Sequence, residues 1–498
     1  MNGSRLPKLV RVAAYAAAEL SSSGRPSLLS APAIAALVLV AALGLPSSAL
    51  GAPQPERRQL TPRLPGSLAQ LPGSRGCLVD RSAASGRCGT ARMLKGPGPF
   101  MGSRAIALSP DGRNVYVASS RSDAIAVFRR NPKTGGLGQP SGTAGCIAAN
   151  GAGGCAKAIG LHGPNSVAVS PDGRSVYATS RGSNSVTVFH RDRSTGALRQ
   201  LPGTAGCVSG LPTPGCATGR GLLGPDVVTI SPDGRNVYVG SFFGNAVAVF
   251  DRDRASGWLS QPAGSAGCVA ETATSGCAVG IALGAPEGMA ISRDGTSVYV
   301  ATALSNALVV LARDPSTGAL AQASDGSGCI VDSPLTGCTT GVQLSGANAV
   351  AVSPRGGSVY VTSLFSNSVT SFSAATSSGG LAQPPGTSGC LVYLRAVGCS
   401  FGRALVAPEG LAVSPDGANL YAAAFGTGAI AVLDRGEKSG ALAQKPGRAG
   451  CLAPRAVAGC SPARALRGVS SIALSPDGRH LYATAFGSNA VDVFRRNE

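Results

Sequence analysis

Residues 165–180 read NSVAVSPDGRSVYATS, two short segments of alternating apolar and polar residues on either side of a Ser-Pro-Asp-Gly tetrapeptide. Pro at the second position and Gly at the fourth are typical of a type I turn, and the third position tolerates Asp. Alternation with a period of two is the pattern of a half-buried β-strand. The stretch therefore predicts a β-hairpin with strands at 165–170 and 175–180.

The turn recurs every 61 residues and begins at Ser109, Ser170, Ser231, Ser292, Ser353, Ser414 and Ser475, reading Ser-Arg-Asp-Gly at Ser292 and Ser-Pro-Arg-Gly at Ser353. Within the example unit, a third strand is predicted at 185–192 and a weaker fourth strand at 197–202. A fixed long period indicates one supersecondary unit per repeat, and four antiparallel strands per unit are typical of a propeller blade. We therefore predict an all-β fold, a seven-bladed β-propeller with four-stranded antiparallel blades.

The two ends of the repeat array complement each other. The chain stops just after the third strand of the last unit, and residues 66–73 (GSLAQLPG) match the fourth strand of other units, for instance 257–264 (GWLSQPAG). We expect the N-terminal strand to complete the last blade and close the ring, which would pair two otherwise exposed strand edges. The predicted propeller spans residues 66–498.

The N-terminus has the layout of a secretory signal. Basic residues extend to Arg25, an apolar stretch covers 33–45, and small residues occupy 47–52. This order predicts a signal peptide at 1–52, followed by a linker at 53–65. An uncleaved anchor is the alternative. We expect a secreted or cell-surface protein with no membrane span after cleavage.

The fourteen cysteines fall into seven local pairs: Cys77 with Cys88, Cys146 with Cys155, Cys207 with Cys216, Cys268 with Cys277, Cys329 with Cys338, Cys390 with Cys399, and Cys451 with Cys460. Export and pairing favour disulfides. Zinc sites would need closer cysteine pairs or neighbouring His, and none of the three His lies beside a pair. We expect each disulfide to close its own loop, with pairing between neighbouring blades as the alternative.

The chain is basic, with a formal net charge of +19. Arg residues are distributed through predicted turns and loops, and no Lys/Arg-rich block with interleaved aromatic residues is present. We interpret the Arg residues as solubilising and expect no specific nucleic-acid partner. Weak attraction to anionic cell-surface polymers is the alternative.

Polar residues stand five positions before each turn serine, at the start of every predicted first strand. They are Arg104, Asn165, Asp226, Glu287, Asn348, Glu409 and Ser470. First strands line the central channel of a propeller, so these residues predict a polar rim at the channel mouth. The rim is a candidate site for a sugar, a lactone or a cation, with Asp226, Glu287 and Glu409 as the candidate acid/base groups or ligands. A water-filled channel is the alternative.

The loops are the other variable part of the repeat. The disulfide loops differ most in sequence, and 391–397 (LVYLRAV) offers Tyr393 and Arg395 as anchors for a partner. The loop after each second strand carries a varying set of Arg and apolar residues, including Arg121, Arg181, Phe242 and Phe243. A Tyr recurs in every second strand, and we predict that these seven Tyr residues pack between blades.

Segments 359–363 (VYVTS) and 184–189 (NSVTVF), followed by 195–198 (TGAL), resemble the YVTN and lactonase-type seven-bladed propellers. The resemblance covers all seven blades. It implies the propeller fold. For function it implies either phosphogluconolactonase-like chemistry or a role as a surface protein.

No sequence signature of an enzyme is present: G-x-S-x-G, Walker, H-E-x-x-H and EF-hand patterns are all missing. We therefore expect an extracellular binding module that recognises a protein or glycan through its disulfide-loop face, without assigned catalytic residues. The alternative is a lactonase-like hydrolase or lyase with a site at the channel mouth. We expect a monomer without a cofactor, with a divalent cation at the channel mouth as the alternative.

Overall fold

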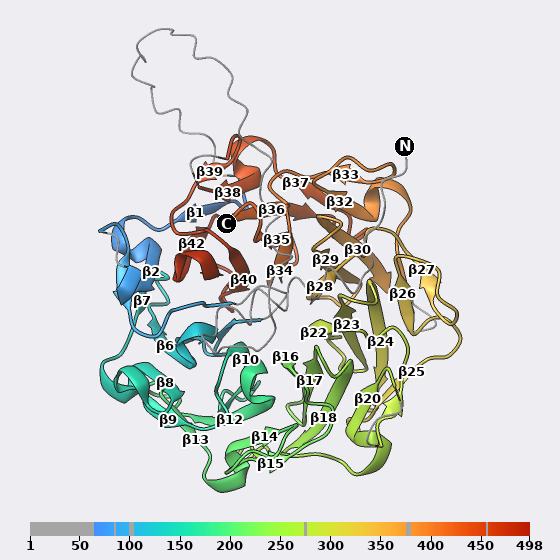
Figure 1. Ribbon diagram of the computed structural model, residues 1–498. Coiled ribbons are helices and arrows are strands. Elements are labelled where there is room, and N and C mark those ends of the chain that lie inside the picture. The colour runs from blue at the N-terminus through green and yellow to red at the C-terminus, as the bar shows by residue number, and fades with distance from the viewer. Residues whose placement is uncertain (1–63, 84–85, 99–103, 273–275, 375–379, 455–456) are drawn as a thin grey trace, which may run out of the picture. The chain divides into compact units, whose positions relative to one another are not determined.

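The computed structural model describes residues 64–83, 86–98, 104–272, 276–374, 380–454 and 457–498. The predicted signal peptide and nearly all of the predicted linker lie outside these residues. Seven six-stranded sheets follow one another around a ring in chain order (Figure 1). The prediction of an all-β seven-bladed propeller is confirmed.

Blade 2 shows how one repeat folds. Its antiparallel strands β10 (Pro164–Val169), β11 (Ser175–Ser180) and β12 (Ser185–Arg191) agree with the predicted strands to within one residue. Between β10 and β11, the Gly173 N–H donates to the Ser170 carbonyl over 2.8 Å, which is the bond expected of the type I turn. The alternating pattern therefore places the hairpin correctly.

Three sets of equivalent strands build the inner part of every blade. The first strands are β4 (Ile106–Leu108), β10, β16 (Pro225–Ile230), β22 (Pro286–Ile291), β28 (Ala347–Val352), β34 (Pro408–Val413) and β40 (Val469–Leu474). The second strands are β5 (Asn114–Ser119), β11, β17 (Asn236–Ser241), β23 (Ser297–Thr302), β29 (Ser358–Ser363), β35 (Asn419–Ala424) and β41 (His480–Ala485). The third strands are β6 (Ala124–Arg130), β12, β18 (Ala246–Arg252), β24 (Ala307–Arg313), β30 (Ser368–Ala374), β36 (Ala429–Arg435) and β42 (Ala490–Arg496).

The outer part of each blade differs from the predicted single fourth strand. In blade 2, β13 (Leu198–Gln200) pairs with one half of β12. A 3-10 turn, η7 (Gly203–Gly206), then interrupts the chain, and β14 (Cys207–Ser209) pairs with the other half. A further edge strand, β15 (Ala217–Thr218), runs parallel to β14. The prediction of four strands per blade was therefore wrong, because the fourth strand is broken and the cysteine loop adds an edge strand.

The same outer segments recur in the other blades. The counterparts of β13 are β1 (Leu68–Gln70), β7 (Leu137–Gly138), β19 (Leu259–Ser260), β25 (Leu320–Gln322), β31 (Leu381–Ala382) and β37 (Leu442–Gln444). Those of β14 are β2 (Cys77–Asp80), β8 (Cys146–Ala149), β20 (Cys268–Ala270), β26 (Cys329–Val331), β32 (Cys390–Val392) and β38 (Cys451–Ala453). Those of β15 are β3 (Gly89–Ala91), β9 (Ala156–Ala158), β21 (Ala278–Val279), β27 (Thr339–Thr340), β33 (Ser400–Phe401) and β39 (Ser461–Pro462).

Blade 7 contains both ends of the described chain. Strand β1 pairs antiparallel with β42, with Leu68 opposite Arg496, and β2 pairs with the other half of β42. The sheet therefore joins β1, β2 and β3 to β40, β41 and β42. N-terminal and C-terminal segments together supply the strands that every other blade draws from one continuous stretch.

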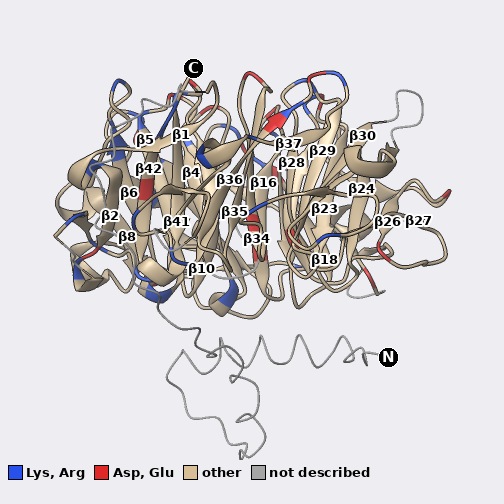
Figure 2. Ribbon diagram, turned by 90° about the horizontal axis from the view of Figure 1, so that it is seen from above, with Lys and Arg blue, Asp and Glu red and all other residues tan. Residues whose placement is uncertain are grey.

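The blades have two distinct ends, which we name by their connections. The turn face carries the Ser-Pro-Asp-Gly turns, the turns after the third strands and the C-terminus, at the top of Figure 2. The loop face carries the loops after the second strands and the connections between blades. The hydrophobic core lies between adjacent blades, where for example Tyr177 and Val188 of blade 2 pack with Val237 and Phe250 of blade 3.

A buried Arg near the end of the third strand joins each blade to the one before it on the turn face. Arg252 of β18 donates from Nε to the Tyr177 hydroxyl over 2.8 Å and from Nη2 to Asp172 over 2.9 Å. Its Nη1 bonds the carbonyl of Gly234 in its own blade over 3.0 Å. The Tyr177 hydroxyl in turn donates to the Gly257 carbonyl over 2.7 Å. We call this arrangement the Arg clasp.

The clasp works because its charge is paired and its hydroxyl stays neutral. The Arg252 side chain is 0% exposed, and a buried guanidinium is tolerated only when it is paired and hydrogen-bonded. Burial raises the pKa of Tyr177 to about 12, so the hydroxyl keeps its proton and can donate. Gly257 has φ +85°, and a Cβ there would collide with Ser175, so the approach requires glycine.

Six blades carry the clasp Arg: Arg130, Arg191, Arg252, Arg313, Arg435 and Arg496. These Arg residues hold blades together and are not the solubilising surface groups we expected. Blade 5 has Ala374 at this position. Its turn also carries Arg355 in place of Asp, so Arg435 of blade 6 bonds Tyr360 and Ser358 instead of a carboxylate.

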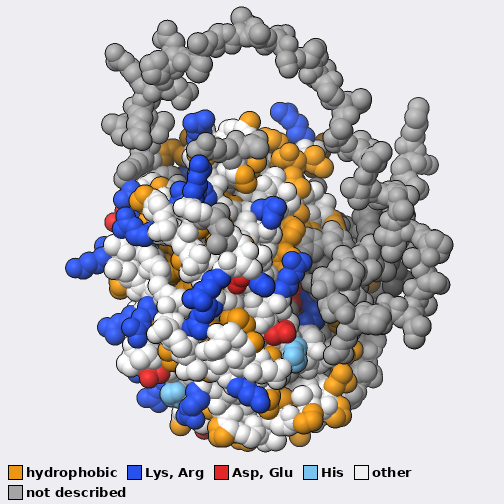
Figure 3. Space-filling model, turned by 60° about the vertical axis from the view of Figure 1, so that its left-hand side comes forward, with side chains coloured by type: hydrophobic (Ala, Val, Ile, Leu, Met, Phe, Trp, Pro, Cys, Tyr) orange, Lys and Arg blue, Asp and Glu red, His pale blue; other side chains and the backbone are white. Residues whose placement is uncertain are grey.

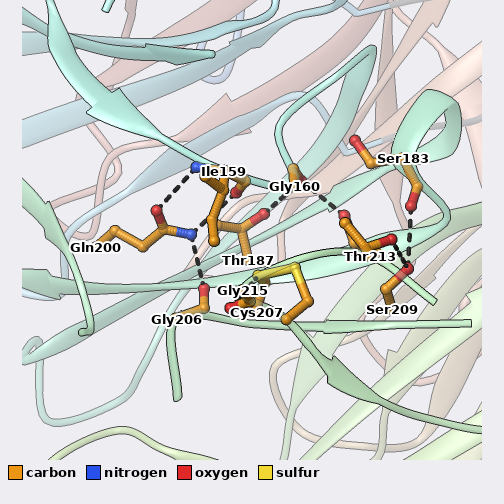
Figure 4. Close-up of a disulfide and its surroundings, with 12 residues drawn as sticks. Ile159, Gly160, Ser183, Thr187, Gln200, Gly206, Cys207, Ser209, Thr213 and Gly215 are labelled. Atoms are coloured by element: carbon orange, nitrogen blue, oxygen red, sulfur yellow. Dashed lines mark hydrogen bonds between the residues drawn. A yellow bond between two sulfur atoms is a disulfide. The ribbon is translucent and has the colours of Figure 1, made fainter. Parts of the chain in front are cut away.

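A recurrent Gln links neighbouring blades at their outer wall (Figure 4). The Gln200 Oε1 accepts from the Ile159 N–H over 2.9 Å, and its Nε2 lies 2.9 Å from the Ile159 carbonyl and 3.0 Å from that of Gly206. Ile159 belongs to blade 1. Equivalent bonds are made by Gln70, Gln139, Gln261, Gln322, Gln383 and Gln444.

All seven disulfides close their own loops, as expected, so the alternative of pairing between neighbouring blades was wrong. The bonded pairs are Cys77 with Cys88, Cys146 with Cys155, Cys207 with Cys216, Cys268 with Cys277, Cys329 with Cys338, Cys390 with Cys399, and Cys451 with Cys460. These residues are all fourteen cysteines of the chain, and they serve a structural role rather than forming a binding site.

The position of each disulfide explains that role. The bond from Cys207 to Cys216 joins the start of β14 to the residue before β15 (Figure 4). In the loop-entropy model, each disulfide stabilises the folded protein by about 2–3 kcal/mol, because it lowers the conformational entropy of the unfolded chain. The disulfides therefore secure the outermost strands. No helix among the described residues is long and apolar enough to cross a membrane.

The missing clasp of blade 5 can be restored by one substitution. Ala374→Arg places a guanidinium where Asp294, Tyr299 and Gly356 occupy the positions of the usual acceptors. We expect a gain of about 1–2 kcal/mol, as for hydrogen bonds to charged groups, and a rise of about 2 °C in the melting temperature. The matched variant Ala374→Met adds length without donors and should give no such gain. Equal melting temperatures for the two variants would contradict the clasp.

Asp492 gives a second test, because it is a fully buried carboxyl where blade 2 has Thr187. Burial raises its pKa well above the usual range, and the Arg464 charge and a 3.0 Å bond from Gln70 oppose this only in part. Since the unfolded chain ionises more readily, this carboxyl costs stability increasingly as pH rises above about 4. Asp492→Thr should raise stability at pH 7 by at least about 1 kcal/mol and by less at pH 4. Denaturant titration at both pH values measures this, and a pH-independent difference would be the contrary result.

Candidate functional site

A backbone irregularity positions six of the seven residues of the predicted polar rim. In six blades the register shifts by one residue at the start of the first strand, as between Pro164 and Ser166 of β10. The extra residue of each bulge is Asn165, Asp226, Glu287, Asn348, Glu409 or Ser470. A bulge re-aims a side chain relative to the regular strand. All six are at most 2% exposed, so they form a buried polar ring and not an open rim.

Asp226 is the centre of the best-defined part of this ring. Arg181, from the loop after β11, donates to Asp226 Oδ1 over 2.7 Å, and Asn165 Nδ2 donates to the same oxygen. The Thr179 hydroxyl lies 3.2 Å from both Asn165 Oδ1 and the Asp226 carbonyl oxygen. Three residues of blade 2 therefore surround a carboxylate of blade 3.

Arg181 connects this carboxylate to the loop face. Its guanidinium lies 4.9 Å from the ring centroid of Phe242 and 5.8 Å from that of Phe243, within the range of a cation–π interaction. The Arg181 side chain is 15% exposed, whereas that of Asp226 is 1% exposed. Phe242 is buried and Phe243 is 51% exposed. A molecule approaching from the loop face would therefore meet Phe243 and Arg181 before Asp226.

On other blades the ring residues bind neighbouring backbone. Asn348 Nδ2 donates to the Pro408 carbonyl over 3.0 Å, and Ser470 Oγ donates to the Gly98 carbonyl over 2.8 Å. Arg104 Nη2 crosses to the Val350 carbonyl of blade 5 over 2.9 Å, and burial lowers its pKa. These bonds give Asn348, Ser470 and Arg104 a structural role in joining blades.

The two ring glutamates lie in tightly packed surroundings. Glu287 and Glu409 are 2% and 0% exposed. Each precedes a glycine, and a Cβ at Gly288 would lie 2.4 Å from the Asn348 carbonyl oxygen. Glycine therefore lets the first strands of blades 4 and 5 approach closely beside Glu287.

The alternative of a cation at the channel mouth gains no support from this geometry. Among the described residues, no group of three or more His, Cys, Asp or Glu side chains is placed to hold a metal ion. We therefore derive no step through a metal.

Tyr393 and Arg395 do not join the ring. They follow β32 in the outer part of blade 5, whereas the ring residues begin the innermost strands. Tyr393 packs partly buried against the core, and exposed Arg395 lies 6.0 Å from the ring centroid of Phe401. The Tyr393 N–H donates to the Asn367 carbonyl over 3.0 Å, so this segment is a separate candidate for partner binding at the outer edge of the loop face.

The sequence predicted the ring but not its partners. Arg181 was visible only as one of several variable loop residues, and Thr179 only as part of a strand. Thr362 bonds Asn348 Oδ1 over 2.7 Å from the position equivalent to that of Thr179. A ring Asn and a Thr fourteen residues later occur together in blades 2 and 5, and this pattern could have predicted that the two side chains are hydrogen-bonded.

The Asp226–Arg181 pair makes a testable contribution to stability. Arg181→Met removes the cation and leaves the buried carboxylate with less compensation, so we expect a loss of about 1–3 kcal/mol. Adding Asp226→Asn should recover part of that loss, because the uncompensated charge is then gone. A double-mutant cycle by denaturant unfolding measures the coupling, and additive losses would rule out a direct pair.

Comparisons with known proteins bear on the family. The family described as "Lactonase, 7-bladed beta-propeller" matches residues 97–150, 146–268, 213–336 and 289–458. No curated protein matches the sequence.

Three solved structures are similar to the chain at a low level. A putative 6-phosphogluconolactonase from Bacteroides uniformis is 20% identical, covering 68% of this chain and 82% of that chain with a TM-score of 0.47. The periplasmic gluconolactonase from Pseudomonas aeruginosa is 20% identical, covering 68% and 83% with a TM-score of 0.46. Hydrazine synthase from Kuenenia stuttgartiensis is 20% identical, covering 80% and 97% with a TM-score of 0.49. Likenesses at this level carry no information on chemistry.

The family match spans most of the propeller and agrees with the blade count and the resemblance noted in the sequence. The chain belongs to the seven-bladed β-propeller lactonase family.

Proposed function

We propose that this protein hydrolyses a lactone, with Asp226 and Arg181 as the reacting groups on the loop-face side of the polar ring. Family membership favours this alternative over the binding module that we first expected. The single observation that supports the site is the carboxylate–guanidinium pair, in which Arg181 lies between Asp226 and the exposed Phe243.

The pair has the two functions that lactone hydrolysis requires. A carboxylate accepts a proton from water as the water oxygen attacks the lactone carbonyl carbon. A guanidinium donates hydrogen bonds to the carbonyl oxygen as negative charge develops there. The ring C–O bond then breaks, and the proton passes from the carboxyl group to the leaving alkoxide. The product is the open hydroxy acid.

Asn165 and Thr179 would act as positioning residues. Asn165 bonds the same Asp226 oxygen as Arg181, and Thr179 reaches both Asn165 and the Asp226 backbone. Together they fix the carboxylate in one orientation. A held carboxylate needs no reorganisation as the reaction proceeds, which is the advantage of a preorganised site.

The test is turnover of a lactone panel by the purified protein. Glucono-δ-lactone, its 6-phosphate and γ-butyrolactone are followed by acid release in a weakly buffered indicator assay. We expect hydrolysis of at least one lactone, with a loss of about 100-fold or more in kcat for Asp226→Asn and for Arg181→Met.

The matched control is Arg121→Met, which removes another loop-face guanidinium, 4.2 Å from the Phe486 ring centroid. Its turnover should equal that of the unmodified protein. Retained activity in Asp226→Asn, at an unchanged melting temperature, would remove Asp226 from the mechanism. An inert panel would refute the proposed function.

A further inference from the structure

Exposed cations gather on the turn face over three consecutive blades. They are Arg113, Arg129, Lys133, Arg174, Arg193, Arg199, Arg479 and Arg495, from blades 1, 2 and 7. We call this set the basic sector. In Figure 2, blue residues lie near β5, β6 and β42 towards the turn face, and others lie lower, towards the loop face. Figure 3 brings the outer wall of these blades forward and shows more Lys and Arg than Asp and Glu side chains there, while the turn face itself points away from the viewer.

Most acids near the sector are already neutralised. The turn carboxylates are each ion-paired with a buried clasp Arg of the following blade: Asp111, Asp172 and Asp477. Among the sector cations, only Arg479 forms an ion pair within the described part of the chain, with Glu498. Asp192 stays exposed, but it lies on blade 2 among three cations of the sector. The clasp therefore consumes most of the negative charge of this face and leaves the exposed cations in excess.

Blade 3 provides an internal comparison, because it has Arg residues at the positions of Arg174 and Arg193 of blade 2. Arg235 and Arg254 are the equivalents of Arg174 and Arg193. In blade 3, however, Asp251 is exposed where blade 2 has a His. Blade 4 continues the trend with three exposed acids: Asp294, Asp314 and Asp325. Blades 3 and 4 therefore have more exposed acids beside their cations than the sector has.

The sector suits an extended anionic chain more than a compact anion or a nucleic acid. Its cations are spread over the turns of three blades and do not converge on one point. Single-stranded nucleic acids are bound by aromatic stacking, and the exposed Trp258 near this face lies on blade 3, outside the sector. Proteins read duplex DNA with a helix or a β-ribbon that enters a groove, whereas this face consists of tight turns.

From this geometry we infer that the basic sector is a binding surface for an anionic polysaccharide that carries carboxylate groups along its length. Several weak, exposed ion pairs act together, so binding depends steeply on salt. The surface lies on the turn face, opposite the loop face that carries the proposed lactone site. The inference therefore stands independently of the proposed function.

The test uses the full secreted chain and immobilised polygalacturonate, with fully methyl-esterified polygalacturonate as the uncharged form of the same polymer. We expect binding to the acidic polymer in 50 mM NaCl, loss of binding in 500 mM NaCl, and no binding to the ester. The variant Arg174→Ser with Arg193→Ser should bind about tenfold more weakly. The matched variant Arg235→Ser with Arg254→Ser should bind as the unmodified protein does.

Several results would overturn the inference. These are equal binding of the esterified polymer, equal weakening by the blade 2 and blade 3 pairs, or no binding in 50 mM NaCl. Tighter binding of a 30-base-pair duplex or of a thymidine 30-mer than of polygalacturonate would reassign the surface to nucleic acid. Because both pairs are exposed side chains, equal melting temperatures will show that neither pair unfolds the ring.

Discussion

The structure depends on the guanidinium of the clasp Arg, which bonds the preceding blade in every blade except blade 5. A charge such as that of Arg191, which is 0% exposed, would be costly in isolation. It is stable because the preceding blade supplies Asp111 and Tyr116, and the blade's own turn supplies a carbonyl. The same constraint neutralises the turn carboxylates of the blades that carry the clasp, so the charge of the turn face depends on its remaining exposed side chains. Blade 5, with Ala374, is the point at which this constraint lapses.

The period of 61 residues was enough to predict the fold, because repetition converts one hairpin into a ring. Strand positions such as 175–180 followed from alternation alone. The broken fourth strand did not, because a cysteine pair with an eight-residue spacer looks like a loop and gives no sign that β15 returns beside β14. The clasp was also missed. Its Arg recurs as regularly as the turn, but its partners lie 75 to 80 residues away on another blade.

The candidate site, like the fold, could be predicted from the sequence only in part. Polar residues at the first-strand starts were recognised because they break an otherwise apolar pattern, and the structure places six of them at bulges. Their burial and their partners were not predictable, because contacts such as Arg181 to Asp226 form between blades. Tyr393 and Arg395 were chosen for their chemistry alone, and the fold places them at the outer edge of the loop face, away from the ring. Two faces therefore emerge with separate properties: a loop face with a buried carboxylate behind an Arg and a Phe, and a turn face with an unbalanced positive sector.

A crystal structure with a lactam soaked in is the most direct measurement of the central claim, since a lactam presents the same carbonyl but resists hydrolysis. We expect density on the loop face, with the lactam carbonyl oxygen within hydrogen-bonding distance of Arg181 and the lactam ring beside Phe243. Density confined to the disulfide loops on the outer wall or to the turn face, with the Asp226–Arg181 pair unchanged, would contradict it.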